Sequence, residues 1–230
     1  MSKEELLIRE AEVEYTSSTR WVHWIRFFSI IILTITGFYI AYVFIAPEVS
    51  SEPTLFLHAK MRMIHEIFGF LLIAVTIYKT YIFFFDKSKV EKLEIVSAKD
   101  ALSPKIWIAQ IKYYLFLGEH PQLKGAYNPL QFAAYVMLYL MVALLSLTGL
   151  ILYVHIYHDG LGGALYSLMR WFEALMGGLA NVRMIHHIAM WIVLIFVPVH
   201  IYMVIFNSIK GKEGALDSVV SGLKFKRKHH

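Results

Sequence analysis

The stretch Met184–Phe206, MIHHIAMWIVLIFVPVHIYMVIF, contains no Asp, Glu, Lys or Arg. It predicts a helix that crosses a membrane, because about 20 apolar residues span the ~30 Å hydrocarbon core. The stretch contains His186 and His200, which are fourteen residues apart. At about 100° and 1.5 Å per residue, the two imidazoles lie within roughly 40° of one face and about 21 Å apart along the axis. Ionisable side chains are costly in lipid, so two of them on one face indicate a functional site.

The rest of the chain has the composition of a membrane protein. Hydrophobic residues make up 58% of its 230 residues and charged residues 17%, which is more apolar than an ordinary soluble domain. Residues 21–45, 63–85, 130–154 and 184–206 are the four predicted spans. We therefore expect an all-α fold, an integral membrane four-helix bundle that forms a single domain over residues 1–230. No removable signal peptide is expected, since no short apolar region with a cleavage site precedes the first span.

Basic residues are distributed unevenly between the segments that join these spans. Most of them follow the second and fourth spans: Lys87, Lys89, Lys92, Lys99, Lys105, Lys112 and Lys124, then Lys210, Lys212, Lys224, Lys226, Arg227 and Lys228. The positive-inside rule then predicts that both termini and the long middle segment are cytoplasmic. Because topology explains these charges, binding to nucleic acid is not expected.

Two further segments have features of helices at the membrane surface. Pro104–Leu117 mixes aromatic and basic residues, which predicts a helix at the cytoplasmic interface. Leu161–Gly178, interrupted by glycines, predicts an amphipathic helix on the periplasmic face. It either docks a partner protein or covers the bundle as a lid. The N-terminal stretch to Glu14 is expected to be an arm or surface helix, and the segment after Phe85 a charged loop.

The histidines fall into two levels when they are sorted by depth. With the N-terminus inside, His65 and His186 lie near the periplasmic ends of their spans, and His23 and His200 lie toward the cytoplasm. Each level contains one imidazole from each of two helices, as bis-histidine ligation of a haem requires. Headgroups would solvate any one of these histidines taken alone, but matched levels favour two haems.

Some neighbouring histidines compete with this assignment. His187 is adjacent to His186 but turned about 100° away from the face shared with His200. His58 precedes His65 by two helical turns and lies farther outside the hydrocarbon. His155 and His158 follow the third span and are expected on the periplasmic surface.

The cysteine count restricts the kind of haem. The chain has no cysteine, which excludes a disulfide, an iron–sulfur cluster and covalent haem attachment in this chain. Any haem is therefore non-covalent, b-type and held by axial side chains. Gly37 lies fourteen residues after His23, on the same face, where a glycine would leave room for a macrocycle.

Arginines lie close in sequence to each proposed ligand. Arg20 and Arg26 flank His23, whereas Arg62 and Arg183 each precede a proposed ligand by three residues. A guanidinium pairs bidentately with a carboxylate, so these side chains are candidates for the haem propionates. Arginines that extend from helix ends to the interface explain the pattern equally well.

A short internal similarity links the first and third spans. Leu33-Thr-Ile-Thr-Gly37 resembles Leu145-Ser-Leu-Thr-Gly149. Small residues allow a backbone or a flat macrocycle to approach a helix closely. Two five-residue matches in apolar helices are weak evidence for duplication.

Two stretches of the chain form a specific pair of motifs. The first is Arg20-Trp-Val-His23-Trp24 followed by Leu33–Gly37. The second is Arg183-Met-Ile-His186-His187-Ile-Ala-Met-Trp191, followed by Phe196 and His200. Together they resemble the signatures of a known family, the cytochrome b subunits of membrane-bound nickel–iron hydrogenases. The resemblance covers nearly the whole chain, and the paired motifs are more specific than four apolar spans.

The resemblance implies a subunit of the bacterial inner membrane that anchors the small and large subunits of a periplasmic hydrogenase. It implies electron transfer from their iron–sulfur clusters to a proximal haem b held by His65 and His186. A distal haem b, held by His23 and His200, would then reduce menaquinone or ubiquinone. Hydrogen activation is expected on the partner subunits, so no catalytic residue is assigned here.

The quinone is expected near the distal haem, where His120, Tyr127 and Asn128 offer hydrogen bonds; a plain turn at Asn128-Pro129 is an equal explanation. The nearest alternative is a di-haem cytochrome b subunit of another quinone-linked dehydrogenase, such as formate dehydrogenase. A histidine-based ion transporter and an anchor without a cofactor remain as less favoured classes, because the polar residues cluster at the ends of the spans.

Overall fold

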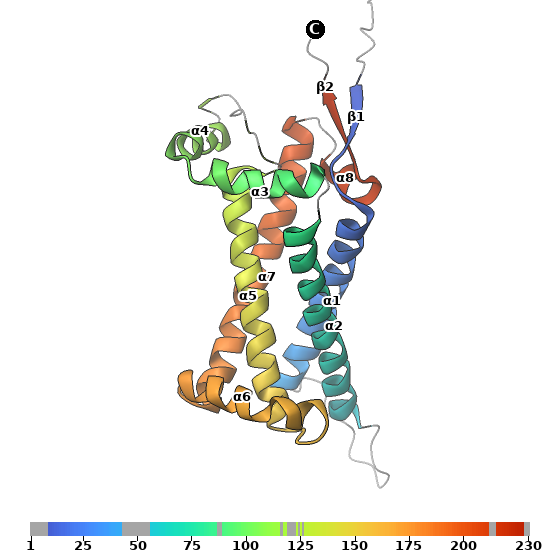
Figure 1. Ribbon diagram of the computed structural model, residues 1–230, viewed down its shortest axis with the longest axis vertical. Helices are drawn as coiled ribbons and strands as arrows, with labels where there is room; N and C mark the ends of the chain where they lie inside the picture. The colour runs from blue at the N-terminus through green and yellow to red at the C-terminus, as the bar shows by residue number, and fades with distance from the viewer. Residues whose placement is uncertain are drawn as a thin grey trace, which may run out of the picture. The chain divides into compact units, whose positions relative to one another are not determined.

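The computed structural model describes residues 9–42, 56–86, 89–115, 117–118, 123, 125, 127–211 and 215–227. The long helices are α1 (Ser17–Tyr42), α2 (Leu57–Phe85), α5 (Pro129–Val154) and α7 (Leu179–Gly211). Shorter elements are β1 (Arg9–Val13), α3 (Lys89–Ala101), α4 (Pro104–Tyr114), α6 (Leu161–Leu175), α8 (Ala215–Ser221) and β2 (Leu223–Arg227) (Figure 1).

The long helices correspond to the predicted spans. Within the described residues, four helices are long and apolar enough to cross a membrane. Each exposes large apolar side chains, among them Ile35 in α1, Ile67 in α2, Leu140 in α5 and Ile195 in α7. Exposed apolar faces on helices of this length suit lipid rather than water. The all-α membrane bundle predicted from the sequence is confirmed, and the protein is a multi-pass membrane protein.

Two local predictions were wrong, and two predicted short helices are present. The charged segment after Phe85, expected to be a loop, forms α3. The N-terminal stretch, expected to be an arm or surface helix, contains β1, which pairs antiparallel with β2 so that Val13 lies opposite Leu223. The predicted interfacial and amphipathic helices are present as α4 and α6. Strand pairing was missed because β1 and β2 lie at opposite ends of the chain, beyond the reach of any local pattern.

The chain divides into two compact units, and the expectation of a single domain stays a prediction. One unit comprises Val22–Tyr78 and Leu138–Leu194; the other comprises Met1–Trp21, Lys79–Met137 and Ile195–His230.

The first of these units contains the apolar contacts that position α6. Met169 of α6 packs with Ile151 and Val154 of α5 and with Val182 of α7, and all four are buried. Figure 1 shows α6 lying across the ends of α5 and α7. A second buried group, Leu72, Val75 and Val142, joins α2 to α5.

An ionic contact also fastens α6 to the end of α5. Nε2 of His155 donates to Oε2 of Glu173 at 2.6 Å, and Nη1 of Arg170 donates to the same oxygen at 2.6 Å. Burial of Glu173 acts to raise its pKa, but the hydrogen bonds and charges of His155 and Arg170 outweigh it and hold the pKa below its usual value. Both His155 and His158 were expected at the surface; the His155 side chain is partly exposed and contacts Glu173, whereas His158 is exposed.

The second unit is held together by turns and caps. The backbone amide of Gly125 donates to Asp100 and that of Tyr127 donates to Ser97, which fastens the segment before α5 to α3. At the start of α5, the side chains of Asn128 and Gln131 each accept from the other residue's backbone amide, at 2.9 and 3.2 Å. This reciprocal capping box satisfies amides that a helix start otherwise leaves unpaired.

Candidate functional site

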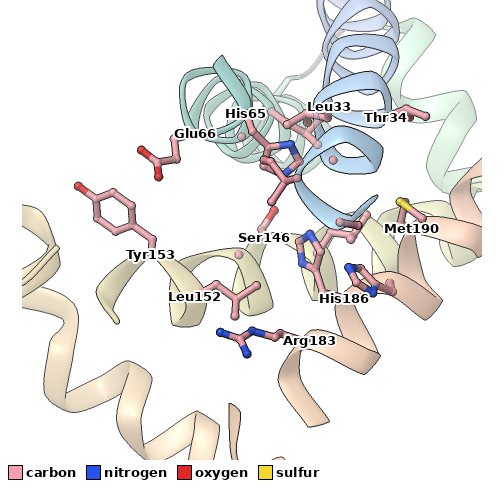
Figure 2. Close-up of a pocket in the computed structure, with 18 of the residues that line it drawn as sticks. Leu33, Thr34, His65, Glu66, Ser146, Leu152, Tyr153, Arg183, His186 and Met190 are labelled. Atoms are coloured by element: carbon pink, nitrogen blue, oxygen red, sulfur yellow. The ribbon is translucent and has the colours of Figure 1, made fainter. Parts of the chain in front are cut away.

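A cavity of about 600 Å³ lies in the unit of Val22–Tyr78 and Leu138–Leu194. It is lined by residues of α1, α2, α5 and α7 and by the segment between α5 and α6. Its wall is mostly apolar, with His65 and His186 among the polar exceptions. Figure 2 shows these two imidazoles reaching into the space from α2 and α7. The structure therefore brings together the two histidines that were matched by depth in the sequence.

The His65 ring is held against α1. Its Nδ1 lies 2.9 Å from Oγ1 of Thr36, which is buried. The next residue, Gly37, lines the cavity, and a Cβ at that position would lie 3.2 Å from Cε1 of His65. The space beside Gly37 is therefore occupied by the imidazole of His65, which lies on α2.

The His186 ring has the same environment on α5. Its Nδ1 lies 2.8 Å from Oγ1 of Thr148, which is also buried. Here too a glycine follows, and a Cβ on Gly149 would lie 3.7 Å from Cε1 of His186. Two threonine–glycine pairs therefore support two histidines on different helices.

Charged side chains line the outer part of the cavity. Arg62 and Arg183 both contribute to its wall and are exposed, so each is able to meet a carboxylate there. Glu66 also lines the cavity and hydrogen-bonds Tyr157, beyond the end of α5. The negative charge of Glu66, followed by burial, raises the pKa of Tyr157.

The competing histidines have different surroundings. His187 lines the cavity but is exposed, and its ring centroid lies 6.5 Å from that of His186. His58 has its ring 6.0 Å from that of Tyr39 and is not among the residues that line the cavity. The geometry therefore favours His65 and His186 as the inward-facing pair.

His23 lies in the same unit as this cavity, near the start of α1. Its ring meets that of Trp24 edge-on at 5.5 Å. One turn later, the guanidinium of Arg26 lies 4.9 Å from the ring centroid of Tyr139 and donates to its hydroxyl at 3.2 Å. Nε of Arg26 is buried and has no hydrogen-bond partner among the described residues.

Arg20 has a structural contact in the other unit. Its Nη1 donates to the backbone carbonyl of Val220, and its Nη2 donates to Oγ of Ser17 at 3.4 Å. The side chain therefore joins the start of α1 to the C-terminal end of α8. This contact gives Arg20 a role that is independent of any propionate.

His200 is surrounded by aromatic rings in that same unit. Its ring stacks on Phe196 at 5.5 Å and meets Tyr135 edge-on at 5.9 Å. Tyr135 in turn contacts Tyr127 at 4.9 Å. His200 and His23 belong to different units, so their pairing at one haem stays a prediction.

The three residues predicted to contact a quinone have different surroundings or lie outside the described residues. Tyr127 lies one aromatic ring away from His200, through Tyr135. Asn128 is buried, and its amide is used by the capping box and by a 3.0 Å hydrogen bond to the hydroxyl of Tyr114. His120 lies outside the described residues.

The cavity fits a haem by the residues it presents. Two imidazoles from separate helices face one space, and its volume lies in the range of ~300–1,000 Å³ that is usual for cofactor sites. The contact of each ring with a threonine uses Nδ1, so Nε2, the usual nitrogen for iron, takes no part in it. Arginines at the edge suit carboxylates, and small residues beside both rings leave space.

Sequence reasoning missed some of the residues around this cavity. The roles of Thr36 and Thr148 were not predicted, although the repeated Thr-Gly at 36–37 and 148–149 was the signal that could have revealed them. Glu66 and Glu173 were missed because no local pattern predicts contacts with residues after α5.

Comparisons with known proteins agree with this geometry. A family model described as prokaryotic cytochrome b561 matches residues 14–222. A "Probable Ni/Fe-hydrogenase B-type cytochrome subunit" of Rhizobium leguminosarum bv. viciae is 30% identical over 223 residues, which covers 95% of this chain and 91% of the relative. Proteins with corresponding names from Rhodobacter capsulatus and Escherichia coli (strain K12) are 24% and 26% identical and cover 90% and 91% of this chain, and 79% and 89% of their own lengths. With the match extending from before α1 to the end of α8, the chain belongs to the prokaryotic cytochrome b561 family and is a multi-pass b-type cytochrome.

Proposed function

We propose that this chain is the membrane subunit that anchors a periplasm-facing nickel–iron hydrogenase and passes its electrons through two b haems to a membrane quinone. The observation that carries the proposal is the cavity with His65 and His186 on its wall, in a chain whose relatives are named hydrogenase cytochrome subunits. A b haem supplies an iron that takes up and releases one electron at a time.

His65 and His186 are the proposed axial ligands of the proximal haem. Nδ1 of each lies within hydrogen-bond distance of a threonine hydroxyl, and both rings line the cavity. Arg62 and Arg183 would hold the propionates at the outer end of the cavity. Apolar side chains make up most of the remaining wall and exclude water from the site.

His23 and His200 are the proposed ligands of the distal haem. The buried, unpartnered Nε of Arg26 supports this, because a buried guanidinium donor calls for an anion such as a propionate. The contact chain from Tyr127 through Tyr135 to His200 supports a quinone close to that haem. We place the quinone contacts on Tyr127 and His120, whereas Asn128 holds the turn from which Tyr127 projects.

The first test is a haem count on the full-length chain purified from membranes. A reduced-minus-oxidised spectrum with a pyridine haemochrome assay should give two b haems per chain. His186→Ala should lose one haem and His200→Ala the other. His158→Ala is the control, since that exposed histidine meets only Tyr166 edge-on at 5.8 Å among its ring contacts and should retain both. A folded wild-type chain without haem would overturn the proposal.

The partner is tested by the electron donor. In membranes that contain the hydrogenase large and small subunits, hydrogen should reduce both haems and then the quinone pool, and His186→Ala should abolish quinone reduction. Haem reduction by formate, with none by hydrogen, would instead assign the chain to a formate dehydrogenase.

A further inference from the structure

The two cavity histidines are held by one repeated arrangement of hydrogen bonds. Oγ1 of Thr36 lies 2.7 Å from the carbonyl oxygen of Ile32, four residues earlier, and 2.9 Å from Nδ1 of His65. Oγ1 of Thr148 lies 2.7 Å from the carbonyl oxygen of Leu144 and 2.8 Å from Nδ1 of His186. The distances match although the threonines lie on different helices.

The position of the threonine hydroxyl proton determines which group donates and which accepts in these hydrogen bonds. A threonine hydroxyl has one proton, and a carbonyl oxygen can only accept. Since each hydroxyl donates to the carbonyl four residues earlier, its oxygen is left to accept from the imidazole. Each histidine must therefore carry its proton on Nδ1, which leaves the lone pair of Nε2 available to a metal.

Burial makes this arrangement persistent. Thr36 is 3% exposed and Thr148 is 0% exposed, so water does not compete for either hydroxyl. At His65 the backbone of Leu33 also hydrogen-bonds the ring. Both contacts reach His65 from α1.

We propose that Thr36 and Thr148 are positioning residues that hold His65 and His186 in the Nδ1-protonated tautomer, with Nε2 presented to the iron of one shared b haem. This proposal rests on the proposed function of the cavity. It also explains the internal similarity between residues 33–37 and 145–149, because each copy supplies a threonine that orients a ring and a glycine that leaves space for it.

The hydrogen bonds should affect affinity and reduction potential together. An accepted bond from Nδ1–H makes Nε2 a stronger donor, and loss of such a partner costs about 10–100-fold in metal affinity. A stronger donor stabilises ferric more than ferrous iron. Removing the hydroxyl should therefore weaken haem retention and raise the midpoint potential of the haem that His65 and His186 bind.

The chain offers matched controls for the experiment. Thr34 and Ser146 precede the two threonines by two residues, line the same cavity, and donate to the backbone carbonyls of Ile30 and Val142 at 2.7 Å rather than hydrogen-bonding either histidine. Thr36→Val and Thr148→Val are compared with Thr34→Val and Ser146→Ala, and with the conservative variants Thr36→Ser and Thr148→Ser. Haem per chain, the two midpoint potentials and the electron paramagnetic resonance spectrum of the ferric haems are measured on full-length chain in native membranes.

Under the proposal, Thr36→Val and Thr148→Val each raise the midpoint potential of one of the two haems and change the resonance signal of one of the two ferric haems. Both variants lose haem about tenfold more readily than the controls. Both serine variants should restore wild-type values. If valine variants and controls behave alike, the positioning role is wrong, while haem loss in His65→Ala and His186→Ala would leave the proposed function standing. A wild-type chain without haem at His65 and His186 overturns both.

Discussion

At the residue scale, the space left by glycine is as important as the side chains that surround it. Gly37 and Gly149 follow the two threonines that hold the imidazoles, and an added Cβ would meet His65 at 3.2 Å but His186 at 3.7 Å. The first distance is tighter than an ordinary van der Waals contact, and the second is ordinary. The two positions are therefore alike in sequence but differ in tolerance.

Gly37→Ala should reduce haem retention at the cavity more than Gly149→Ala does. The His65 ring is held by Thr36 and has little freedom to move away from a new methyl group. Gly69→Ala is the control, because it lines the same cavity with no atom within 4 Å of the added Cβ. Haem per chain after detergent extraction measures the effect; equal retention in all three variants would contradict it.

At the element scale, α6 is held to α5 by one buried carboxylate as well as by apolar contacts. Glu173 is 7% exposed and receives both His155 and Arg170. A charge in such a place is stabilising only while it is paired. The docking of α6 is therefore sensitive to the charge at a single position.

Glu173→Gln should loosen α6 by about 1–3 kcal/mol, the usual contribution of hydrogen bonds to a charged group. Proteolysis or hydrogen exchange within residues 161–175 measures this loss of stability. Glu173→Asp tests whether a carboxylate on a shorter side chain can still hold α6.

Because the pKa of Glu173 is lowered in the folded chain, its contribution to stability is present above the ordinary carboxyl pKa and is lost as the pH falls through the lowered value. Exchange in α6 should therefore rise at pH values below the ordinary carboxyl pKa in the wild type but not in the Gln variant; a flat wild-type profile would count against the contact.

At the scale of the whole molecule, the two ends of the chain are joined to each other. β1 pairs with β2, and the amides of Glu14 and Tyr15 both donate to the carbonyl of Gly222. Gly222 has a φ of +85°, and a Cβ there would lie 2.8 Å from the carbonyl oxygen of Tyr15. Only glycine suits this position without strain.

Gly222→Ala should separate the ends of the chain, at a cost of about 1–3 kcal/mol. Trypsin should then cleave the segment of Lys224 and Lys226 faster than in the wild type. Gly178→Ala is the control, since its φ of +99° imposes similar backbone strain but no atom lies within 4 Å of the new Cβ. Unchanged cleavage in the Gly222 variant would show that the ends are not held in this way.

The orientation of the chain in the membrane is predicted from its charges and is also testable. The lysines after α2 and α7 predict cytoplasmic termini. Alkaline phosphatase fused after Gly160 should be active, because that turn is expected in the periplasm, whereas a C-terminal fusion should be inactive. The opposite pattern would reverse the proposed sides of both haems.

Much of the architecture and part of the site were readable from local pattern. The spans were predicted because an apolar run of membrane length has few alternatives in lipid. The pairing of His65 with His186 followed from depth alone, since helix rise fixes the level of each residue. The sequence left two explanations for Asn128, a quinone contact or a plain turn before the third span. Its hydrogen bonds at the start of α5 favour the turn.

What the sequence by itself determined, then, is what depends on composition and on spacing along one helix: the spans, the shared face of His186 and His200, and the b-type character of any haem. Tertiary structure decided what depends on contacts between helices. It set Thr36 against His65 and Thr148 against His186, fastened α6 through Glu173, and paired β1 with β2. The physical reason is that hydrogen bonds and burial act over a few ångströms in space, whereas sequence patterns report only on neighbours along the chain.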